Sequence, residues 1–221
     1  MSSVDGNIRK LRESLPDHVK IVAVSKTRPP AMIMEAWNEG VRLFGENRVQ
    51  ELLAKREELP SDIEWHLIGH LQTNKVKFIV PFVSMIESVD SFKLLKAINR
   101  EAETAGRTIN CLLQIHIASE ETKYGFSLPE IEEMLGSKEY SLLRSVSIRG
   151  VMGMATFTDN MSLVRQEFRQ LRTCFETLKK KYFAADSNFS EVSMGMSGDY
   201  MIAVEEGSTI IRVGSLLFGE R

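Results

Sequence analysis

Short apolar segments alternate with helical segments along almost the whole chain. The apolar segments are rich in β-branched residues and are apolar at consecutive positions, which is typical of strands covered on both faces. Regular alternation of strands and helices indicates a parallel sheet, because parallel neighbours need a crossover connection. The expected strands cover residues 20–25, 41–45, 65–69, 84–89, 110–117, 148–155, 191–194 and 209–213.

The expected helices cover residues 5–14, 31–39, 47–59, 74–80, 90–105, 129–135, 162–182 and 200–206. Gly40 and Gly106 follow two of them at positions where glycine commonly ends a helix. Within the third helix, Glu51 and Lys55 are spaced to form an ion pair one turn apart. The strand–helix units together favour a closed (β/α)8 barrel of the TIM type, forming one domain over residues 1–221. An open doubly wound sheet is the alternative.

Composition limits the partners and the location of the chain. Lysine and arginine total 28 and aspartate and glutamate total 30, for a net charge of −2. We therefore expect neither nucleic acid nor a membrane surface as a partner. No apolar run is long enough for a transmembrane helix, and the polar segment Met1–Pro16 is no secretory signal. Cys111 and Cys174 lie in apolar segments and are expected to be buried free thiols, so we predict a cytoplasmic location. The outer helices are charged, which favours a monomer.

In a parallel barrel the functional face lies at the carboxyl ends of the strands. Glycines and small polar side chains gather just after the expected strands, where they let a ligand approach the backbone closely. The segments concerned are 25–27, 45–47, 69–72, 119–123, 153–154, 194–199 and 213–215. We predict a ligand site formed by some of these segments.

Lys26 directly follows the first apolar strand, so its amine is expected to point into the mouth of the barrel. Desolvation there disfavours the charged ammonium, and a neutral amine is the form that makes a Schiff base. Alternatively, Lys26 extends to solvent or pairs with a carboxylate such as Glu46.

Two segments near the end of the chain are suited to binding phosphate. Ser197 is followed by Gly198, Asp199 and a short expected helix, while Gly214 and Ser215 follow the last strand. Backbone N–H groups in such loops bind phosphate without a cation, although ordinary turn chemistry also explains their composition. A closed barrel places its first and last strands side by side, which brings Lys26 close to these loops.

Arg212 lies inside an otherwise apolar strand, so its guanidinium needs a partner. Either it hydrogen-bonds a ligand, such as a pyridine nitrogen, or it forms an ion pair with a carboxylate such as Glu205 or Glu206. Asn47 has two similar alternatives, namely a helix N-cap or a cofactor contact.

Histidine and methionine residues near the strand ends suggest little further chemistry. His66, His70 and His116 could ligate zinc, but no cysteine or carboxylate recurs at a metal-ligand spacing, so no metal site is expected. Methionines are adaptable apolar side chains that suit a core or a cofactor pocket. Those concerned are Met152, Met154, Met194 and Met196.

Several motifs occur in a recognisable order and spacing. They are Ala23–Thr27, Phe44–Asn47, Trp65–Lys75, Arg149–Met154, Ser193–Ser197, Gly207–Gly214 and Leu217–Gly219. Together, over nearly the whole chain, they resemble the pyridoxal phosphate homeostasis protein family, the YggS/PROSC-like proteins. Departures are minor: His70 stands where many relatives have proline, His116 where many have asparagine, and Ser215 where threonine is common.

The resemblance implies a fold like the N-terminal domain of alanine racemase. It also implies that pyridoxal 5′-phosphate is held as a Schiff base on Lys26, with phosphate contacts from the two late loops and Arg212 near the pyridine nitrogen. The cofactor-binding residues implied in this way are Lys26, Asn47, Met196, Ser197, Arg212, Gly214 and Ser215.

For function, the resemblance implies a carrier or regulator in intracellular vitamin B6 homeostasis, with pyridoxal-phosphate-dependent apoenzymes as candidate recipients. The alternative is a pyridoxal-phosphate-dependent amino-acid racemase or lyase. Alanine racemases use a second base from an additional C-terminal β-domain. This sequence ends at Arg221, just after the last expected strand, so we expect that domain to be absent and enzymatic turnover to be insignificant. A pure interaction scaffold would leave Lys26 and the phosphate loops unexplained.

Overall fold

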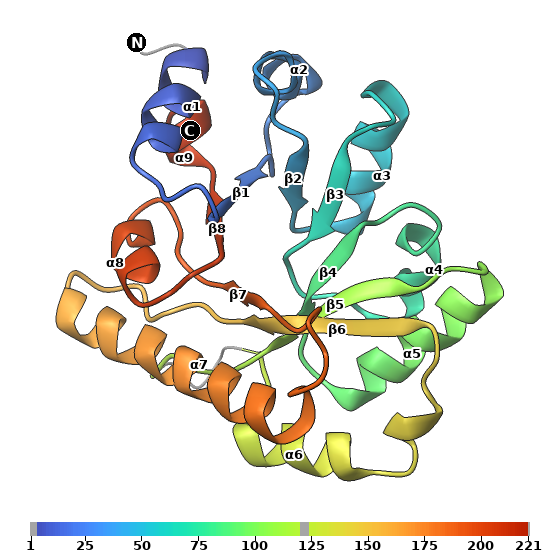
Figure 1. Ribbon diagram of the computed structural model, residues 1–221. Helices are drawn as coiled ribbons and strands as arrows, with labels where there is room; N and C mark the ends of the chain where they lie inside the picture. The colour runs from blue at the N-terminus through green and yellow to red at the C-terminus, as the bar shows by residue number, and fades with distance from the viewer. Residues whose placement is uncertain (1–3, 120–123, 221) are drawn as a thin grey trace.

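Parallel strands follow one another in sequence order around a closed barrel, and the last strand pairs with the first (Figure 1). The computed structural model describes residues 4–119 and 124–220. The strands are β1 Lys20–Val24, β2 Leu43–Glu46, β3 Glu64–Leu67, β4 Met85–Val89, β5 Ile109–Gln114, β6 Val146–Met152, β7 Glu191–Ser193 and β8 Ile210–Val213. The predicted (β/α)8 barrel is confirmed, and the open doubly wound sheet is wrong.

Helices surround the barrel and connect its strands (Figure 1). They are α1 Val4–Glu13, α2 Pro30–Asn38, α3 Val49–Glu58, α4 Val76–Ile79, α5 Phe92–Thr104, α6 Leu128–Gly136, α7 Met161–Tyr182, α8 Tyr200–Glu205 and α9 Ser215–Phe218, with 3₁₀ turns at η1 Thr73–Lys75 and η2 Tyr140–Leu142. Helix α9 was not predicted, because four residues are too few to show a helical apolar period. It packs beside α1, where the Asn7 amide donates a hydrogen bond to Leu217 O at 3.0 Å.

Several predicted boundaries are wrong by two or three residues. The strands expected at 110–117 and 148–155 end at Gln114 and Met152, although apolar residues continue into the following loops. Ile115 and Ala155 are buried there, so the apolar run reflects burial beyond the end of the strand. Helix α3 begins at Val49 after Arg48, which excludes Asn47 as its N-cap.

The interior of the barrel changes character along the strands. An apolar layer is formed by Val22, Met85, Leu112, Met152 and Ile210. Side chains two residues apart on a strand face the same side, so the next layer toward the carboxyl ends includes residues two positions later. In β4 and β8 those residues are Glu87 and Arg212, both buried. The sequence therefore places charged groups inside the barrel, just below its functional face.

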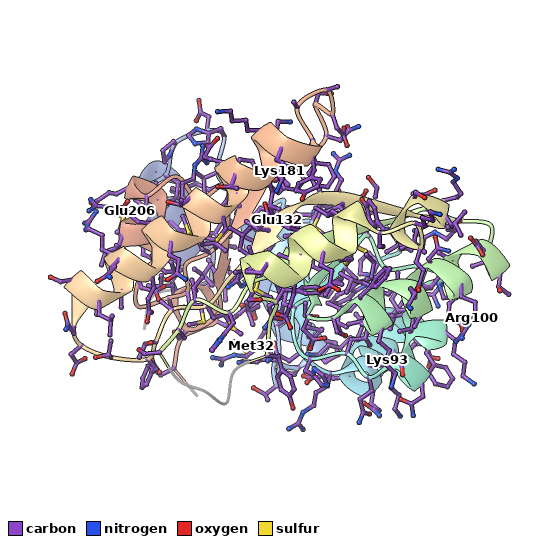
Figure 2. All side chains as sticks on the ribbon, turned by 90° about the horizontal axis from the view of Figure 1, so that it is seen from below. Met32, Lys93, Arg100, Glu132, Lys181 and Glu206 are labelled. Carbon is purple, nitrogen blue, oxygen red and sulfur yellow. The ribbon has the colours of Figure 1, made fainter. Side chains whose placement is uncertain are left out.

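A large apolar core lies between the strands of the barrel and the surrounding helices, whose outer surfaces are charged. Phe44, Leu67, Ile86 and Phe168 are among the fully buried side chains of this core. The outer surfaces of the helices carry charged side chains (Figure 2), and Lys181 of α7 pairs with Glu132 of α6 at 2.8 Å.

Cys111 and Cys174 are buried free thiols, as expected. Of the helices in the described ranges, none has the length and apolar character needed to span a membrane.

Gly195 offers a test of the packing between β7 and α8. Its φ is +96°, and an added Cβ would lie 2.6 Å from the Cβ of Ala203. Gly195→Ala should lower the free energy of unfolding by about 1–3 kcal/mol, because it adds both backbone strain and a steric overlap. Gly198→Ala is the control, since its added Cβ would meet nothing within 4 Å. Urea unfolding of both variants without added cofactor checks this, and equal stability would contradict it.

Candidate functional site

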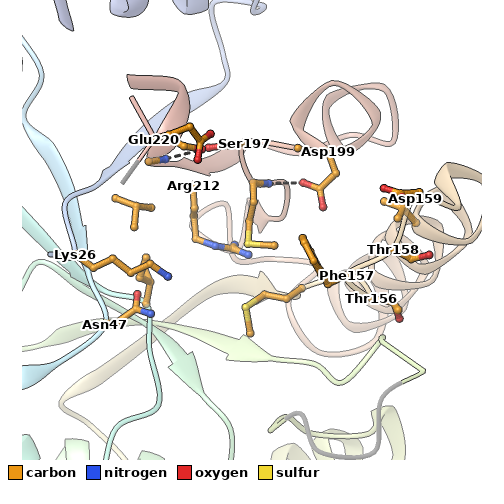
Figure 3. A pocket seen from close by; sticks show the side chains of 18 of the residues that line it. Lys26, Asn47, Thr156, Phe157, Thr158, Asp159, Ser197, Asp199, Arg212 and Glu220 are labelled. Carbon is orange, nitrogen blue, oxygen red and sulfur yellow. Dashed lines mark hydrogen bonds between the residues drawn. The ribbon is translucent and has the colours of Figure 1, made fainter. Parts of the chain in front are cut away.

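A cavity of about 640 Å³ opens at the carboxyl end of the barrel. Loops that follow β1, β2, β6, β7 and β8 contribute to its lining. The residues predicted from the sequence to contact a cofactor all line this cavity: Lys26, Asn47, Met196, Ser197, Arg212, Gly214 and Ser215. Segments from opposite ends of the chain therefore meet at one site, as the closure of the barrel predicts (Figure 3).

Lys26 enters the cavity from the end of β1. Residues 22–25 just before it are buried, whereas Lys26 itself is half-buried. Its side chain points into the cavity toward Arg212, with Asn47 beside it (Figure 3). Glu46, the alternative partner of Lys26, is instead held by Lys55 at 2.6 Å and by the hydroxyl of Ser25 at 2.6 Å.

The two predicted phosphate loops contact each other. The Oγ of Ser197 accepts hydrogen bonds from the backbone N–H groups of Gly214, at 3.2 Å, and Leu216, at 3.4 Å. An added Cβ on Gly214 would lie 3.2 Å from Val24 O, so glycine lets β8 pass close to β1. The loops thus bring backbone N–H groups and a hydroxyl together beside Lys26.

Asp199 shapes the loop after β7. Its carboxylate accepts a hydrogen bond from the Met196 N–H at 2.5 Å, and helix α8 begins at the next residue, Tyr200. This arrangement holds Met196 and Ser197 against the cavity, where Met196 supplies an apolar wall.

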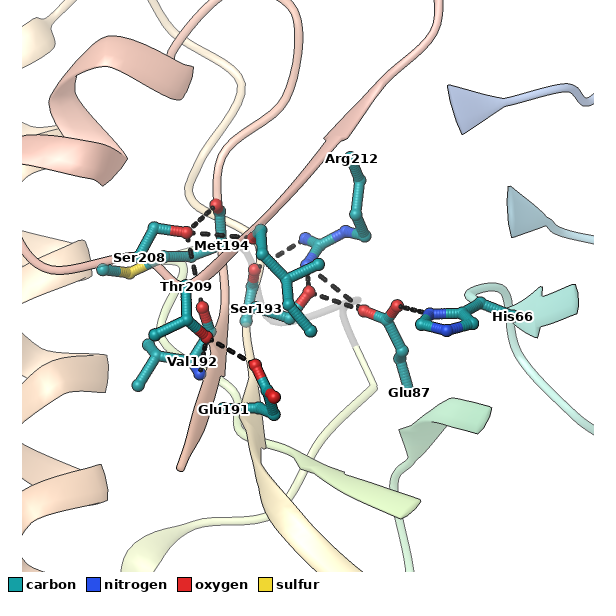
Figure 4. A network of polar contacts seen from close by, with 11 residues as sticks. His66, Glu87, Glu191, Val192, Ser193, Met194, Ser208, Thr209 and Arg212 are labelled. Carbon is teal, nitrogen blue, oxygen red and sulfur yellow. Dashed lines mark hydrogen bonds and ion pairs between the residues drawn. The ribbon is translucent and has the colours of Figure 1, made fainter. Parts of the chain in front are cut away.

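Arg212 reaches the cavity from inside the barrel, where it is buried (Figure 4). Its Nη1 donates to Ser193 Oγ at 2.6 Å, and its Nη2 donates to Gly153 O at 2.9 Å. Its carboxylate partner is Glu87, with Nη1 and Oε2 3.8 Å apart.

The alternative prediction that Arg212 pairs with Glu205 or Glu206 is wrong. Both instead pair with Arg165 of α7, and Glu206 also pairs with Arg169. The reason is geometric: β8 directs Arg212 to the inside of the barrel, whereas these glutamates lie at the end of α8, outside it.

Glu87 connects Arg212 to His66 (Figure 4). Its Oε1 lies 2.7 Å from His66 Nδ1, and its Oε2 accepts a hydrogen bond from Ser193 Oγ at 2.5 Å. Burial by itself raises the pKa of Glu87, but His66, Arg212 and Ser193 together hold that pKa below its ordinary value. Burial lowers the pKa of Arg212, an effect that the charge of Glu87 opposes. The network therefore holds a carboxylate and a guanidinium inside the barrel.

His70 and the loop after β5 have local partners. His70 Nδ1 lies 2.8 Å from an oxygen of Asp90, and the His70 ring stacks on Tyr124. Within residues 4–119 and 124–220, no three histidine, cysteine, aspartate or glutamate side chains form a group that could hold a metal ion. Of the loop at 119–123, only Ser119 lies in the described ranges, and its N–H is 3.2 Å from Glu167 Oε1.

Glu87 and Ser193 were not singled out from the sequence. Glu87 is a lone carboxylate in the apolar strand Met85–Val89, the same signal that identified Arg212. Because each strand carries one buried charge of opposite sign, the sequence contained the signal for an ion pair between Glu87 and Arg212. Ser193 gave no comparable signal, because serine at a strand end is common. The segment at 156–159 also lines the cavity and was not predicted.

Comparison with known proteins agrees with this geometry. The family model described as alanine racemase, N-terminal domain, matches residues 1–221. A pyridoxal phosphate homeostasis protein of Aquifex aeolicus is 42% identical over 204 residues, which cover 91% of this chain and 87% of that protein. The chain belongs to the pyridoxal phosphate homeostasis protein family. Another member, from a Synechocystis species, is 36% identical, and the match covers 94% of each chain.

Solved structures also resemble this family member. PipY of Synechococcus elongatus, solved with PLP bound, has a TM-score of 0.89 and 39% identity, covering 98% of this chain and 100% of that chain. An alanine racemase of Clostridium difficile has a TM-score of 0.77 at 15% identity, covering 99% of this chain and 56% of the racemase. The second likeness shows the shared fold alone. The resemblance found in the sequence is thus confirmed for the family and the fold.

Replacing Glu87 should test the interior network. Glu87→Gln removes the only charge that the described residues place against the buried Arg212 within ion-pair distance. We expect a loss of about 3–5 kcal/mol in the free energy of unfolding, because the guanidinium is left buried without its counter-charge. Glu139→Gln is the control, since the Glu139 side chain is 63% exposed and pairs with Lys96 at the surface. That change should cost at most about 1 kcal/mol in urea unfolding.

The difference in stability between the wild type and Glu87→Gln should also depend on pH. Because the folded chain holds the pKa of Glu87 below 4.5, its stabilisation is present above pH 4.5 and is lost as the pH falls through the lowered value. The stability difference between the wild type and Glu87→Gln should therefore narrow in acid. A difference that stays constant from about pH 7 to about pH 3 would contradict an ionised Glu87.

Proposed function

We propose that this chain binds pyridoxal 5′-phosphate as a Schiff base on Lys26 and acts as a carrier or regulator in intracellular vitamin B6 homeostasis. The observation that carries the proposal is the meeting of Lys26, Arg212 and the Ser197 and Gly214 loops around one cavity. The structure of PipY with PLP bound supports the same ligand. We further propose that the protein acts in the cytoplasm as a monomer with a single barrel domain, and that pyridoxal-phosphate-dependent apoenzymes receive the cofactor.

The donors around the cavity fit each end of this ligand. A lysine amine suits an aldehyde, and backbone N–H groups with serine hydroxyls suit a phosphate. A guanidinium has five N–H donors, and the contacts with Ser193 and Gly153 use two of those of Arg212 in the described chain. Further donors are left for an acceptor such as a pyridine nitrogen. In the proposal, Ser197, Gly214 and Ser215 hold the phosphate, and Asn47 and Met196 contact the ring.

When bound, pyridoxal phosphate supplies an electrophilic aldehyde carbon and an electron-withdrawing ring. The residues of the chain have separate tasks around it. Lys26 presents its amine, Arg212 orients the ring by donating a hydrogen bond without giving up its proton, and Glu87 keeps the guanidinium in place. The cavity opens at the end of the barrel, which suits exchange of the ligand with other proteins.

Replacing Lys26 should test the assignment. Wild-type protein mixed with pyridoxal phosphate should gain a near-visible absorption band that borohydride removes, leaving a reduced adduct on Lys26 in peptide maps. Lys26→Ala should lose both the band and the adduct, because no amine remains at the end of β1. Lys93→Ala is the matched control, since Lys93 is exposed on α5 and does not line the cavity. A full-strength, reducible band in Lys26→Ala would overturn the assignment.

The alternative function, an amino-acid racemase or lyase, makes a different prediction. Racemisation needs one group to remove a proton from one face of the substrate and another to return it on the opposite face. The described lining of the cavity includes no histidine, tyrosine or cysteine. Its carboxylates are Asp159, Asp199 and Glu220, and Asp199 already accepts the Met196 N–H. A missing acid or base costs about 10²–10⁴-fold in rate.

We therefore expect no significant turnover of free amino acids by the protein loaded with pyridoxal phosphate. Chiral separation of products from each enantiomer checks this, with a known racemase as the positive control. Turnover of about 1–10³ s⁻¹, the range typical of enzymes, would overturn the carrier proposal if Lys26→Ala abolished it.

A further inference from the structure

The backbone on both sides of Lys26 is held by side chains from β2 and α3. Before it, Ser25 O accepts a hydrogen bond from Lys55 Nζ at 2.6 Å, and Ser25 Oγ donates to Glu46 Oε1 at 2.6 Å. After it, the Thr27 N–H donates to Glu51 Oε1 at 2.5 Å. Lys26 thus lies between two anchored neighbours, one on each side.

Lys55 and Glu51 join these anchors into one unit. The ammonium of Lys55 has three donors, and they reach Ser25 O, Glu46 Oε1 at 2.6 Å and Glu51 Oε1 at 2.7 Å. Glu51 Oε1 accepts from both Lys55 and Thr27. Contacts therefore run from Ser25 through Lys55 and Glu51 to Thr27, passing around Lys26.

The burial of Lys55 argues against an ordinary surface ion pair. The Glu51 and Lys55 spacing correctly predicted their pairing, but it did not predict that Lys55 is only 5% exposed and also pairs with the fully buried Glu46. Burying an ion pair is costly, and such a pair is often no more stable than apolar residues in its place. Stabilising the fold is thus a poor explanation for these charges, whereas holding Ser25 and Thr27 explains where they lie.

The backbone conformation of Thr27 explains why its N–H needs a hydrogen-bond partner that holds it. Its φ is +63°, and no other described residue except glycine has a positive φ. β-Branched residues rarely adopt this conformation, and it persists only where surrounding contacts enforce it. The bond from Thr27 to Glu51 is such a contact, and it holds the turn that immediately follows Lys26.

We propose that Glu51 and Lys55 form a clamp that positions Lys26 for Schiff-base formation by holding the backbone of Ser25 and Thr27. The proposal rests on the proposed function only for the role of Lys26. Neither Glu51 nor Lys55 lines the cavity, so both are positioning residues. Burial raises the pKa of Glu51, but Lys55 and the Thr27 N–H outweigh burial and hold that pKa below its ordinary value, which keeps the carboxylate charged at neutral pH.

The test compares Glu51→Ala with Glu57→Ala. Both residues lie on α3, but Glu57 is exposed and forms no hydrogen bond or ion pair with the described residues. In protein without cofactor, Glu51→Ala should speed hydrogen exchange of the Thr27 amide by about tenfold, the effect of losing one hydrogen bond to a charged group. With added pyridoxal phosphate, it should also slow formation of the absorption band by about tenfold. Glu57→Ala should change neither rate.

Two further variants separate positioning from general destabilisation. Glu51→Gln keeps an oxygen that can accept the Thr27 N–H, so its amide exchange should stay closer to that of the wild type. Adding Thr27→Gly to Glu51→Ala should restore part of the band-formation rate, because glycine adopts a positive φ without strain. A double variant no faster than Glu51→Ala would overturn the claim that the clamp acts by holding this turn.

The two measurements, Thr27 amide exchange and formation of the absorption band, test the clamp and the proposed function separately. If the wild type forms no band with pyridoxal phosphate, the proposed function fails, while the Thr27 exchange rates still test the clamp. Unchanged Thr27 exchange in Glu51→Ala overturns the clamp, whatever the protein binds. Slower band formation in Glu57→Ala, equal to that in Glu51→Ala, would also overturn it, because the effect would then come from α3 as a whole.

Discussion

The site depends on an ion pair buried inside the barrel, between Glu87 of β4 and Arg212 of β8. Taking both charges out of water is costly, and the cost is offset only where the remaining donors and acceptors are satisfied. Ser193 bridges the two groups, His66 contacts the second oxygen of Glu87, and Gly153 O accepts from the guanidinium. Strands from opposite sides of the barrel are thereby linked at one level, and the guanidinium that they hold forms part of the cavity lining.

Closure of the barrel supplies the rest of the site. Because β1 pairs with β8, the lysine at the start of the chain lies beside the glycine–serine loop at its end. The interior network holds Arg212 from below, while the contacts of Lys55 and Glu51 hold the backbone around Lys26 from the side. Two polar networks, one inside the barrel and one between β2 and α3, thus position different parts of a single site. Each contains a buried ion pair, and neither places its carboxylates in the cavity lining.

Much of this could be predicted from the sequence, and the failures have physical reasons. The apolar periods located the strands and long helices, and the residues after the strands included the Lys26, Ser197 and Gly214 positions that line the cavity. Helix α9 was missed because it is too short to show a period. Asn47 was placed in a helix because a polar residue before an apolar run resembles an N-cap, yet α3 begins at Val49. The partner of Arg212 was sought among its neighbours in sequence, whereas the fold supplied Glu87 from across the barrel.

Local and periodic patterns therefore determined the class of fold, the face that carries the site and the residue types gathered there. These features follow from backbone geometry, because alternating strands and helices leave few ways to close a parallel barrel. Only the tertiary structure decided which buried charges meet. Pairing depends on distances of a few ångströms between side chains on strands far apart in sequence, and on the strand register that turns each residue inward or outward. Lys55 illustrates the difference: its pair with Glu51 was evident from helical spacing, while its contacts with Glu46 and Ser25 exist only once α3 packs against the barrel.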